Sequence, residues 1–188
     1  MNLPRELWTT KVQSVPESVR DVIERYLIRI DDMLPRGAGM ILSGPTGVGK
    51  TCIGSLVLKE ARSRGYTTYF ISVWELRECI RNRVMFSEEL SILDRCRTVD
   101  VLVLDGLCED DGKERFFGSR AIEELVAFRG SHRHATLVTT RMDVMGLRKA
   151  MKGFFEATQN YLVMLPVNGP DQRCEKNNDL KKMILGDG

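Results

Sequence analysis

The sequence predicts an α/β fold, a three-layer sandwich in which helices cover both faces of a parallel sheet of about five strands. Short apolar, β-prone runs alternate with longer runs of helical periodicity, which is typical of parallel strands joined by helical crossovers. A glycine-rich turn also directly follows the first strand, and ligands of such folds lie at the carboxyl ends of the strands. The length of 188 residues corresponds to one domain of ordinary size.

The first half of the chain predicts two strands and several helices. Pro16 followed by Glu17 is typical of a helix start, and Pro35–Gly37 breaks that helix. A later helix is expected to end at Gly65, and the run TTYFISV after it is strongly β-prone. In order, the expected elements are a helix within 14–34, a strand at 40–43, a helix at 52–64, a strand at 67–73, and helices at 74–84 and 87–95.

The second half continues the alternation. The run VDVLVLD is a continuous apolar strand that ends in an acid, and the polar, acidic stretch after it is typical of a linker. The run ATLVTT is again β-prone, whereas its flanks have helical spacing. The expected elements are a strand at 99–105, a linker at 108–117, a helix at 119–130, a strand at 135–140, a helix at 144–153 and a strand at 161–165.

The glycine-rich turn has the sequence GPTGVGKT, which matches the phosphate-binding P-loop, G-x-x-x-x-G-K-T. Its glycines permit the backbone to curl around a polyanion, and the following helix adds its positive end. Lys50 is expected to reach the β- and γ-phosphates of ATP, and the Thr51 hydroxyl to hold Mg²⁺. The expected nucleotide-binding residues are Gly44, Pro45, Thr46, Gly47, Val48, Gly49, Lys50, Thr51 and Cys52.

Asp105 supplies the second half of this site. It closes the apolar run VLVLD, the Walker B form, and is expected to lie beside Thr51 and hold the magnesium. Asp105 follows Thr51 by 54 residues, and the strand at 67–73 lies between them in the sequence. One strand is therefore expected to separate the two motif strands in the sheet, which is the organisation of AAA+ and RecA-like ATPases.

The residues that activate water are less clear from the sequence. Gly106 stands where such ATPases carry a second carboxylate. Glu109, Asp110 or Glu75 could replace it, although each could equally be a solvated acid. Hydrolysis is then expected to be slow or to depend on a partner. Thr139 and Thr140 end the next strand and could sense the γ-phosphate. The expected catalytic set is Lys50, Asp105, Thr140 and Glu109.

Composition excludes several other classes of protein. Five cysteines, without C-x-x-C spacing, indicate neither a disulfide framework nor a zinc site and favour a reducing cytoplasm. No run approaches the roughly 20 apolar residues that cross a bilayer, so no membrane is expected. A net charge of +2 does not by itself indicate nucleic acid. A local basic cluster could bind single-stranded DNA or be a solvated surface: Arg77, Arg81, Arg83, Lys113, Arg115 and Arg120.

Over residues 3–173 the chain resembles the DnaC/IstB family of AAA+ ATPases. The resemblance rests on an ordered set of motifs rather than on the P-loop alone. It implies an AAA+ ATPase domain at 1–173, a polar and mobile tail at 174–188, and a lead-in that lies near the adenine. The motifs are the lead-in Leu3–Trp8, GPTGVGKT, the bend Arg64-Gly65-Tyr66, VLVLDGL, Phe128-Arg129 followed by ATLVTTRMDV, and the closing Gly169-Pro170-Asp171-Gln172-Arg173.

The chain departs from the family pattern at several positions. Gly106 replaces the second acid, and Arg141 stands in place of the sensor asparagine. The family's arginine-finger box is not recognisable, which leaves Arg129, Arg148 and Lys152 as candidates to reach the phosphates of a neighbouring subunit. The sequence also shows no region before Leu3 of the kind that grips a replicative helicase.

The resemblance implies ATP-controlled assembly on DNA, with ATP or ADP bound, as a helicase loader or replication accessory factor. A replicative helicase, a transposase and further copies of the chain are the expected partners. A nucleotide-switched assembly factor or transposition helper with little hydrolysis is a second hypothesis, which Gly106 favours. A small P-loop kinase is a third, for which Arg141, Arg148 and Lys149 offer weak support as a lid.

Overall fold

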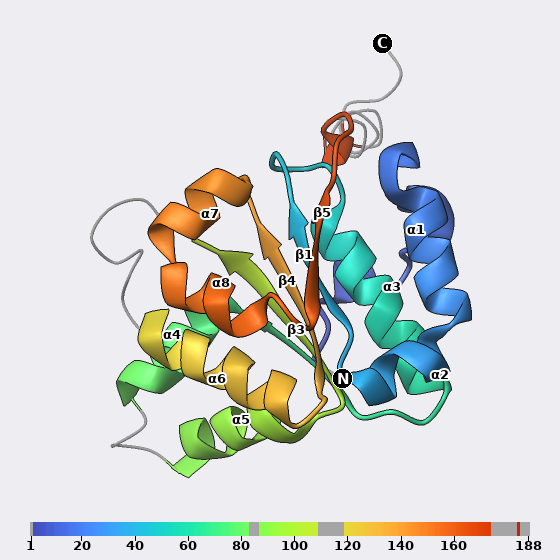
Figure 1. Ribbon diagram of the computed structural model, residues 1–188. Coiled ribbons are helices and arrows are strands. Elements are labelled where there is room, and N and C mark those ends of the chain that lie inside the picture. The colour runs from blue at the N-terminus through green and yellow to red at the C-terminus, as the bar shows by residue number, and fades with distance from the viewer. Residues whose placement is uncertain (1, 83–86, 109–118, 174–183, 185–188) are drawn as a thin grey trace.

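A computed structural model describes residues 2–82, 87–108, 119–173 and 184, and it contains one five-stranded sheet (Figure 1). All neighbouring strands are parallel, in the order β2-β3-β4-β1-β5. The predicted parallel sheet of five strands is therefore confirmed. The strands are β1 (Gly39–Ser43), β2 (Thr68–Ser72), β3 (Val101–Leu107), β4 (Ala135–Thr140) and β5 (Leu162–Pro166).

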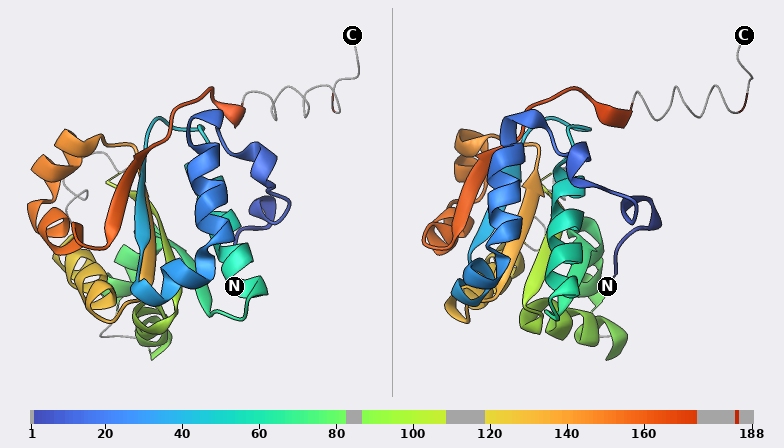
Figure 2. Two further views of the ribbon diagram at one scale, coloured as in Figure 1. Left: turned by 45° about the vertical axis from the view of Figure 1, so that its right-hand side comes forward. Right: turned by 90° about the vertical axis from the view of Figure 1, so that its right-hand side faces the viewer.

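Helices form a layer on each face of the sheet (Figures 1 and 2). One layer contains α1 (Glu17–Ile28), α2 (Ile30–Met33) and α3 (Lys50–Ser63), with the short 3₁₀ helices η1 (Arg5–Leu7), η2 (Val12–Ser14) and η3 (Leu34–Arg36). The other contains α4 (Val73–Asn82), α5 (Ser87–Thr98), α6 (Ser119–Ser131), α7 (Val144–Ala150) and α8 (Lys152–Thr158). Within the described ranges, no helix has the length and apolar character to cross a membrane.

Strand β3, which lies between β2 and β4, shows why the sequence forms this sandwich. Val101 and Val103 point into the core beneath α1 and α3, whereas Leu102 and Leu104 point into the core beneath α4 to α8. All four side chains are fully buried. Because successive side chains of a strand face opposite sides, a strand covered on both faces must be apolar throughout.

One strand separates the P-loop strand β1 from the Asp105 strand β3, as predicted. That strand is β4, which follows β3 in the sequence, whereas β2 lies at the edge of the sheet. The chain order alone did not identify the inserted strand, because a helical crossover can carry the chain past neighbouring positions in the sheet.

The predicted helix at 144–153 is in fact divided into α7 and α8, and the sequence did not predict α8. Met151 ends α7 because its backbone leaves the helical region, with φ −140° and ψ 68°. Its side chain is buried, and Cys108 Sγ lies 3.4 Å from Met151 Sδ. The predicted linker at 108–117 and tail at 174–188 lie outside the described residues, except for buried Cys108 and exposed Ile184.

Candidate functional site

The glycine-rich loop lies at the carboxyl edge of the sheet, between the end of β1 and the start of α3 (Figure 1). Gly49, with φ +97°, precedes the first turn of α3, and buried Val48 anchors the loop in the core. The Gly44 N–H donates to the Thr140 carbonyl at 3.2 Å. The positive end of a 14-residue helix therefore faces the concave side of the loop, where phosphate groups are stabilised.

Lys50 places its ammonium group along this loop. Its Nζ donates to the carbonyl oxygens of Gly44 and Pro45, each at 2.7 Å. The side chain is only 6% exposed, so the charge is held close to the backbone rather than extended into solvent. A buried ammonium group beside a helix N-terminus is suited to bind a polyanion.

Asp105 joins the P-loop to the neighbouring strands. Its Oδ1 atom accepts hydrogen bonds from the hydroxyls of Thr51 and Thr139, both at 2.8 Å. The Gly106 N–H in turn donates to Thr139 Oγ1 at 2.8 Å. Hydroxyl and carboxylate oxygens are the ligands that Mg²⁺ prefers, so the donor set of Thr51 and Asp105 fits this ion.

These groups line a cavity of about 380 Å³. The lead-in contributes Glu6 and Leu7 to its wall, and the closing segment contributes Gln172 and Arg173. Segments from both ends of the domain therefore meet at the glycine-rich loop, which the sequence did not predict for the closing segment. The remaining wall is formed by Thr46, Gly47, Gly49, Lys50, Thr51, Cys52 and Asp105.

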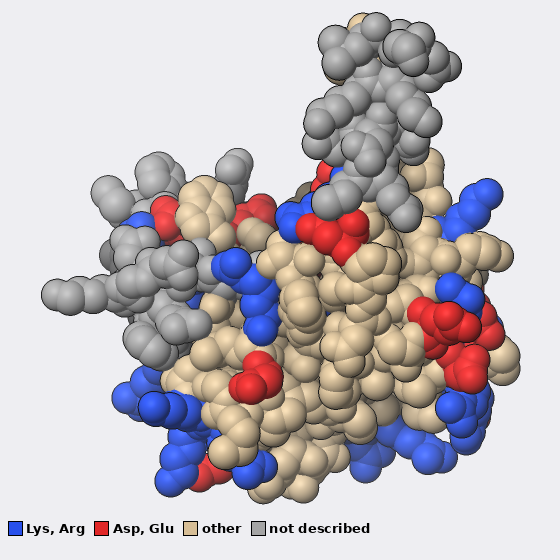
Figure 3. All heavy atoms as spheres, turned by 90° about the horizontal axis from the view of Figure 1, so that it is seen from above, with Lys and Arg blue, Asp and Glu red and all other residues tan. Residues whose placement is uncertain are grey.

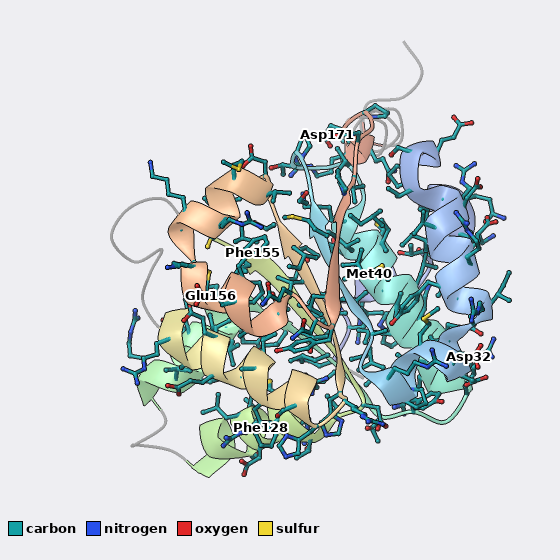
Figure 4. The ribbon with its side chains drawn as sticks, in the orientation of Figure 1. Asp32, Met40, Phe128, Phe155, Glu156 and Asp171 are labelled. Atoms are coloured by element: carbon teal, nitrogen blue, oxygen red, sulfur yellow. The ribbon has the colours of Figure 1, made fainter. Side chains whose placement is uncertain are left out.

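The closing segment is tied to the loop. The Gln172 N–H donates to the Gly47 carbonyl at 3.1 Å, and Gln172 Nε2 donates to the Ser14 carbonyl at 3.0 Å. Asp171, at the end of the chain segment after β5 (Figure 4), packs so closely on Gly47 that any side chain there would overlap its carboxylate. Hydrogen bonds from Arg173 lower the pKa of Asp171 to about 2, and this pairing neutralises a carboxylate near the phosphate-binding loop.

Thr139, rather than Thr140, is the residue of β4 that faces the site. The Thr140 hydroxyl donates to the Leu107 carbonyl at 2.7 Å and is fully buried. The alternation of side chains along the two strands explains why Thr139, and not Thr140, lies beside Asp105. Val103 and Leu137 belong to the core beneath α3, so Asp105 and Thr139, two residues further along their strands, face the same side.

Of the three predicted water-activating acids, only Glu75 belongs to the described residues, and it does not line the cavity. Glu109 and Asp110 lie outside the described residues. Glu75 lines a different cavity, together with Tyr69 and Arg95. Glu6, which the sequence did not single out, is instead a carboxylate on the wall of the cavity at the glycine-rich loop. Its position within the lead-in motif Leu3–Trp8 is the sequence feature that could have identified it as a residue of this cavity.

Gly106 has a structural reason for lacking a side chain. Its φ is +85°, and the register between β3 and β4 shifts between Leu104 and Leu107. The residue after Asp105 therefore lies in a β-bulge with left-handed backbone, which glycine adopts at little cost.

We expect Gly106→Glu to lower the free energy of unfolding by about 1–2 kcal/mol and to leave ATP turnover no faster, because an L-residue is strained at this φ. Urea unfolding and an ATPase assay would measure both. Gly65→Glu is the matched control, because Gly65 has a similar positive φ of +90° and open space around it. It therefore measures the cost of the same backbone strain at a position away from the bulge. Wild-type stability combined with faster turnover would show that the bulge accepts a second acid.

Arg129 is not available as an arginine finger, and this correction follows from burial. Its side chain is 0% exposed. The guanidinium donates to the carbonyls of Cys96, Val99 and Ala135 and to Thr136 Oγ1. Such a side chain cannot reach a neighbouring subunit.

The two other candidates for the finger lie on the surface of α7 and α8, away from the cavity wall. The Arg148 guanidinium lies over the Phe155 ring at 5.2 Å, and Lys152 pairs with Glu156 at 3.6 Å. Neither contact tests their role in an assembly.

The predicted basic cluster is only partly on the surface. Arg77 is buried, Arg81 pairs with Glu78, and exposed Arg120 pairs with Glu124. Arg83, Lys113 and Arg115 lie outside the described residues. Figure 3 views the end of the molecule that carries the P-loop, where acidic and basic side chains form separate small groups around a mainly uncharged centre. The described part of this cluster thus forms no continuous basic surface.

Comparison with solved structures shows that the chain has the AAA+ fold. No protein-family model and no curated protein sequence matches it. The DnaC helicase loader superposes with a TM-score of 0.74 at 17% identity, covering 88% of this chain and 100% of that one. DnaI superposes with a TM-score of 0.73 at 22% identity, covering 92% and 95%. The replication initiator DnaA, bound to AMPPCP and single-stranded DNA, gives 0.71 at 15% identity, covering 98% and 57%. The predicted likeness to DnaC-type AAA+ domains is confirmed at the level of the fold.

Proposed function

We propose that this chain is an ATP-binding AAA+ ATPase that acts on DNA as a helicase loader or replication accessory factor, through ATP-controlled assembly. The observation that carries the proposal is the hydrogen bond between Thr51 and Asp105 at the mouth of the P-loop cavity. The fold of this chain matches nearly the whole length of the DnaC and DnaI structures, and this likeness supports the proposed role in replication.

The residues of the cavity divide the binding of MgATP among them. The loop amides, the N-terminus of α3 and Lys50 bind the phosphates, since all present positive charge to one concave surface. Leu7 and Glu6 of the lead-in lie where the resemblance places the adenine. Thr51 and Asp105 hold the metal, which supplies Lewis-acid stabilisation of charge on the phosphates. Thr139 orients Asp105 through its own hydroxyl.

Slow hydrolysis, or a nucleotide switch with little hydrolysis, is the second candidate function. The bulge at Gly106 favours it, because the backbone there excludes an acid in the usual place. Glu109 and Asp110, both outside the described residues, and Glu6 on the cavity wall are the carboxylates that we propose as candidates to activate water. A partner protein or a further copy of the chain would then complete the site and set the rate. The replicative helicase, a transposase and single-stranded DNA are the partners we propose to test.

We expect Asp105→Ala to lower a DNA-stimulated ATPase rate on the order of 100-fold, because the metal loses the ligand that positions it. The measurement is phosphate release with and without single-stranded DNA. Nucleotide affinity in the presence of a chelator should stay unchanged, which separates loss of the metal from loss of the fold.

Asp21→Ala, on the exposed surface of α1, is the control and should keep the wild-type rate. An Asp105→Ala protein with full DNA-stimulated turnover would refute the site. A wild-type protein that binds MgATP but releases no phosphate, with DNA or without, would favour the switch.

A further inference from the structure

A row of planar side chains lies at the opposite end of the molecule from the P-loop. The Arg97 guanidinium lies over the Phe128 ring at 4.7 Å. Phe128 stacks on His132 with ring centroids 4.0 Å apart, and His132 is followed by His134 with centroids 6.5 Å apart. Figure 4 shows Phe128 at the lower end of α6, far from Asp171. The row therefore lies beyond the amino ends of the strands.

The end of α6 holds the two imidazoles in this arrangement. The backbone N–H of His132 donates to the Phe128 carbonyl, and the backbone N–H of His134 donates to the Arg129 carbonyl at 2.8 Å. Arg133 between them has φ +57°, which reverses the chain and brings the two rings within 6° of parallel. His132 Nδ1 lies 2.8 Å from the Phe128 carbonyl oxygen and 3.1 Å from Ser131 Oγ, and these contacts hold the ring in place.

The two imidazoles are nearly parallel, with ring centroids 6.5 Å apart. Phe128 and His132 are in direct contact, with centroids 4.0 Å apart, so Phe128 supports one side of the His132 ring. His132 is exposed and His134 is half-buried, so solvent reaches the pair.

Three exposed arginines lie around the row, and the carboxylate of Asp100 also acts on His134. Arg36, Arg97 and Arg133 are exposed, and none of them forms an ion pair with any carboxylate of the described residues. A Cβ on Gly37 would lie 2.8 Å from the Arg133 Cα, so Arg36 and Arg133 are neighbours. Burial, with the Arg129 guanidinium nearby, lowers the pKa of His134. The charge at neutral pH therefore comes from the arginines, and His134 is an uncharged stacking surface.

We propose that this row, Arg97, Phe128, His132 and His134 with Arg36 and Arg133, is a binding site for single-stranded nucleic acid. Unpaired bases stack on the exposed imidazole of His132 and on His134 beside it, and the arginines contact the flanking phosphates. Aromatic stacking joined to a basic surface is the chemistry by which proteins hold unpaired strands. An acidic peptide would use the arginines but not the parallel rings. The site is separate from the P-loop and does not require bound nucleotide.

Fluorescence anisotropy with short labelled oligothymidylate and oligouridylate tests the proposal and separates DNA from RNA. We expect His132→Ala to weaken binding about tenfold and His132→Phe, which keeps a ring, to restore most of the affinity. Arg133→Gln should reduce the slope of log affinity against log salt by about 0.7, the value of one phosphate contact. A duplex of equal length should bind at least tenfold more weakly, because its bases are not free to stack.

Two further measurements separate this site from the P-loop. His132→Ala should bind MgATP as the wild type does, and Lys50→Ala should bind the oligonucleotide at this row with unchanged affinity. An oligonucleotide carrying 5-iodouracil should photocross-link to the peptide that contains residues 128–134. Equal binding of duplex, unchanged affinity in a folded His132→Ala protein, or cross-links confined to other segments would each overturn the proposal.

Discussion

Replacing Lys50 with alanine is expected to abolish productive binding of ATP, with a loss of at least about 100-fold in affinity. The ammonium group lies against the loop carbonyls of Gly44 and Pro45 and is nearly buried. Charge-assisted hydrogen bonds contribute about 1.5–3 kcal/mol each, so removing the only cation inside the described part of the loop removes most of the phosphate attraction. Titration with a fluorescent ATP analogue or calorimetry would measure the loss.

Lys149→Ala is the matched control, because Lys149 lies on the exposed surface of α7. It should bind ATP as the wild type does. Thermal unfolding without nucleotide checks that the Lys50→Ala protein is folded. A folded Lys50→Ala protein with unchanged affinity for ATP would refute the assignment of the site, whatever the protein does with DNA.

Replacing Arg129 with methionine is expected to lower the free energy of unfolding by about 3–5 kcal/mol, because each buried carbonyl left without a donor costs about 1–3 kcal/mol. The guanidinium joins the end of α5, through the carbonyls of Cys96 and Val99, to the start of β4. Without it, these buried carbonyls lose their donors. In a chain of this size, such a change lowers the melting temperature by about 10 °C. Urea and thermal unfolding would measure both quantities.

Arg129→Lys and Arg120→Ala complete this experiment. Lysine keeps a charge but has no planar fork, so it should recover only part of the stability. Arg120 is exposed and paired only with Glu124, so its loss should change the stability by less than about 0.5 kcal/mol. If the Arg129→Met protein kept wild-type stability and lost only ATP turnover, the structural role of Arg129 would be refuted. Arg129 would then again be a candidate arginine finger.

The sequence predicted the pairing of Thr51 with Asp105 although 54 residues separate them. The motif places Thr51 at the start of a helix, and the apolar run places Asp105 at the end of a strand. Parallel strands bring their carboxyl ends to one edge, so both residues had to lie at that edge. The prediction of Thr140 was wrong, and Thr139 was predictable from the sequence. The alternation of side chains along the strand places Thr139 on the same side as Leu137, which faces α3.

Other features could not be predicted from local sequence. Arg129 has the same helix-end context as a solvated arginine, and only the approach of α5 and β4 buries it. The division of α7 from α8 depends on a pocket that accepts Met151 beside Cys108. The parallel imidazoles of His132 and His134 arise from the reversal of the chain at Arg133.

Thus the sequence by itself determined the glycine-rich loop, the acid that pairs with Thr51 and the layered α/β class, because each depends on the chemistry of a short segment or on a periodicity within it. The tertiary structure alone decided the order of the strands, the burial of Arg129 and the row of rings at the far end. Those features depend on contacts between segments distant in the chain, and the free energy of such contacts is set by the packing of the whole domain.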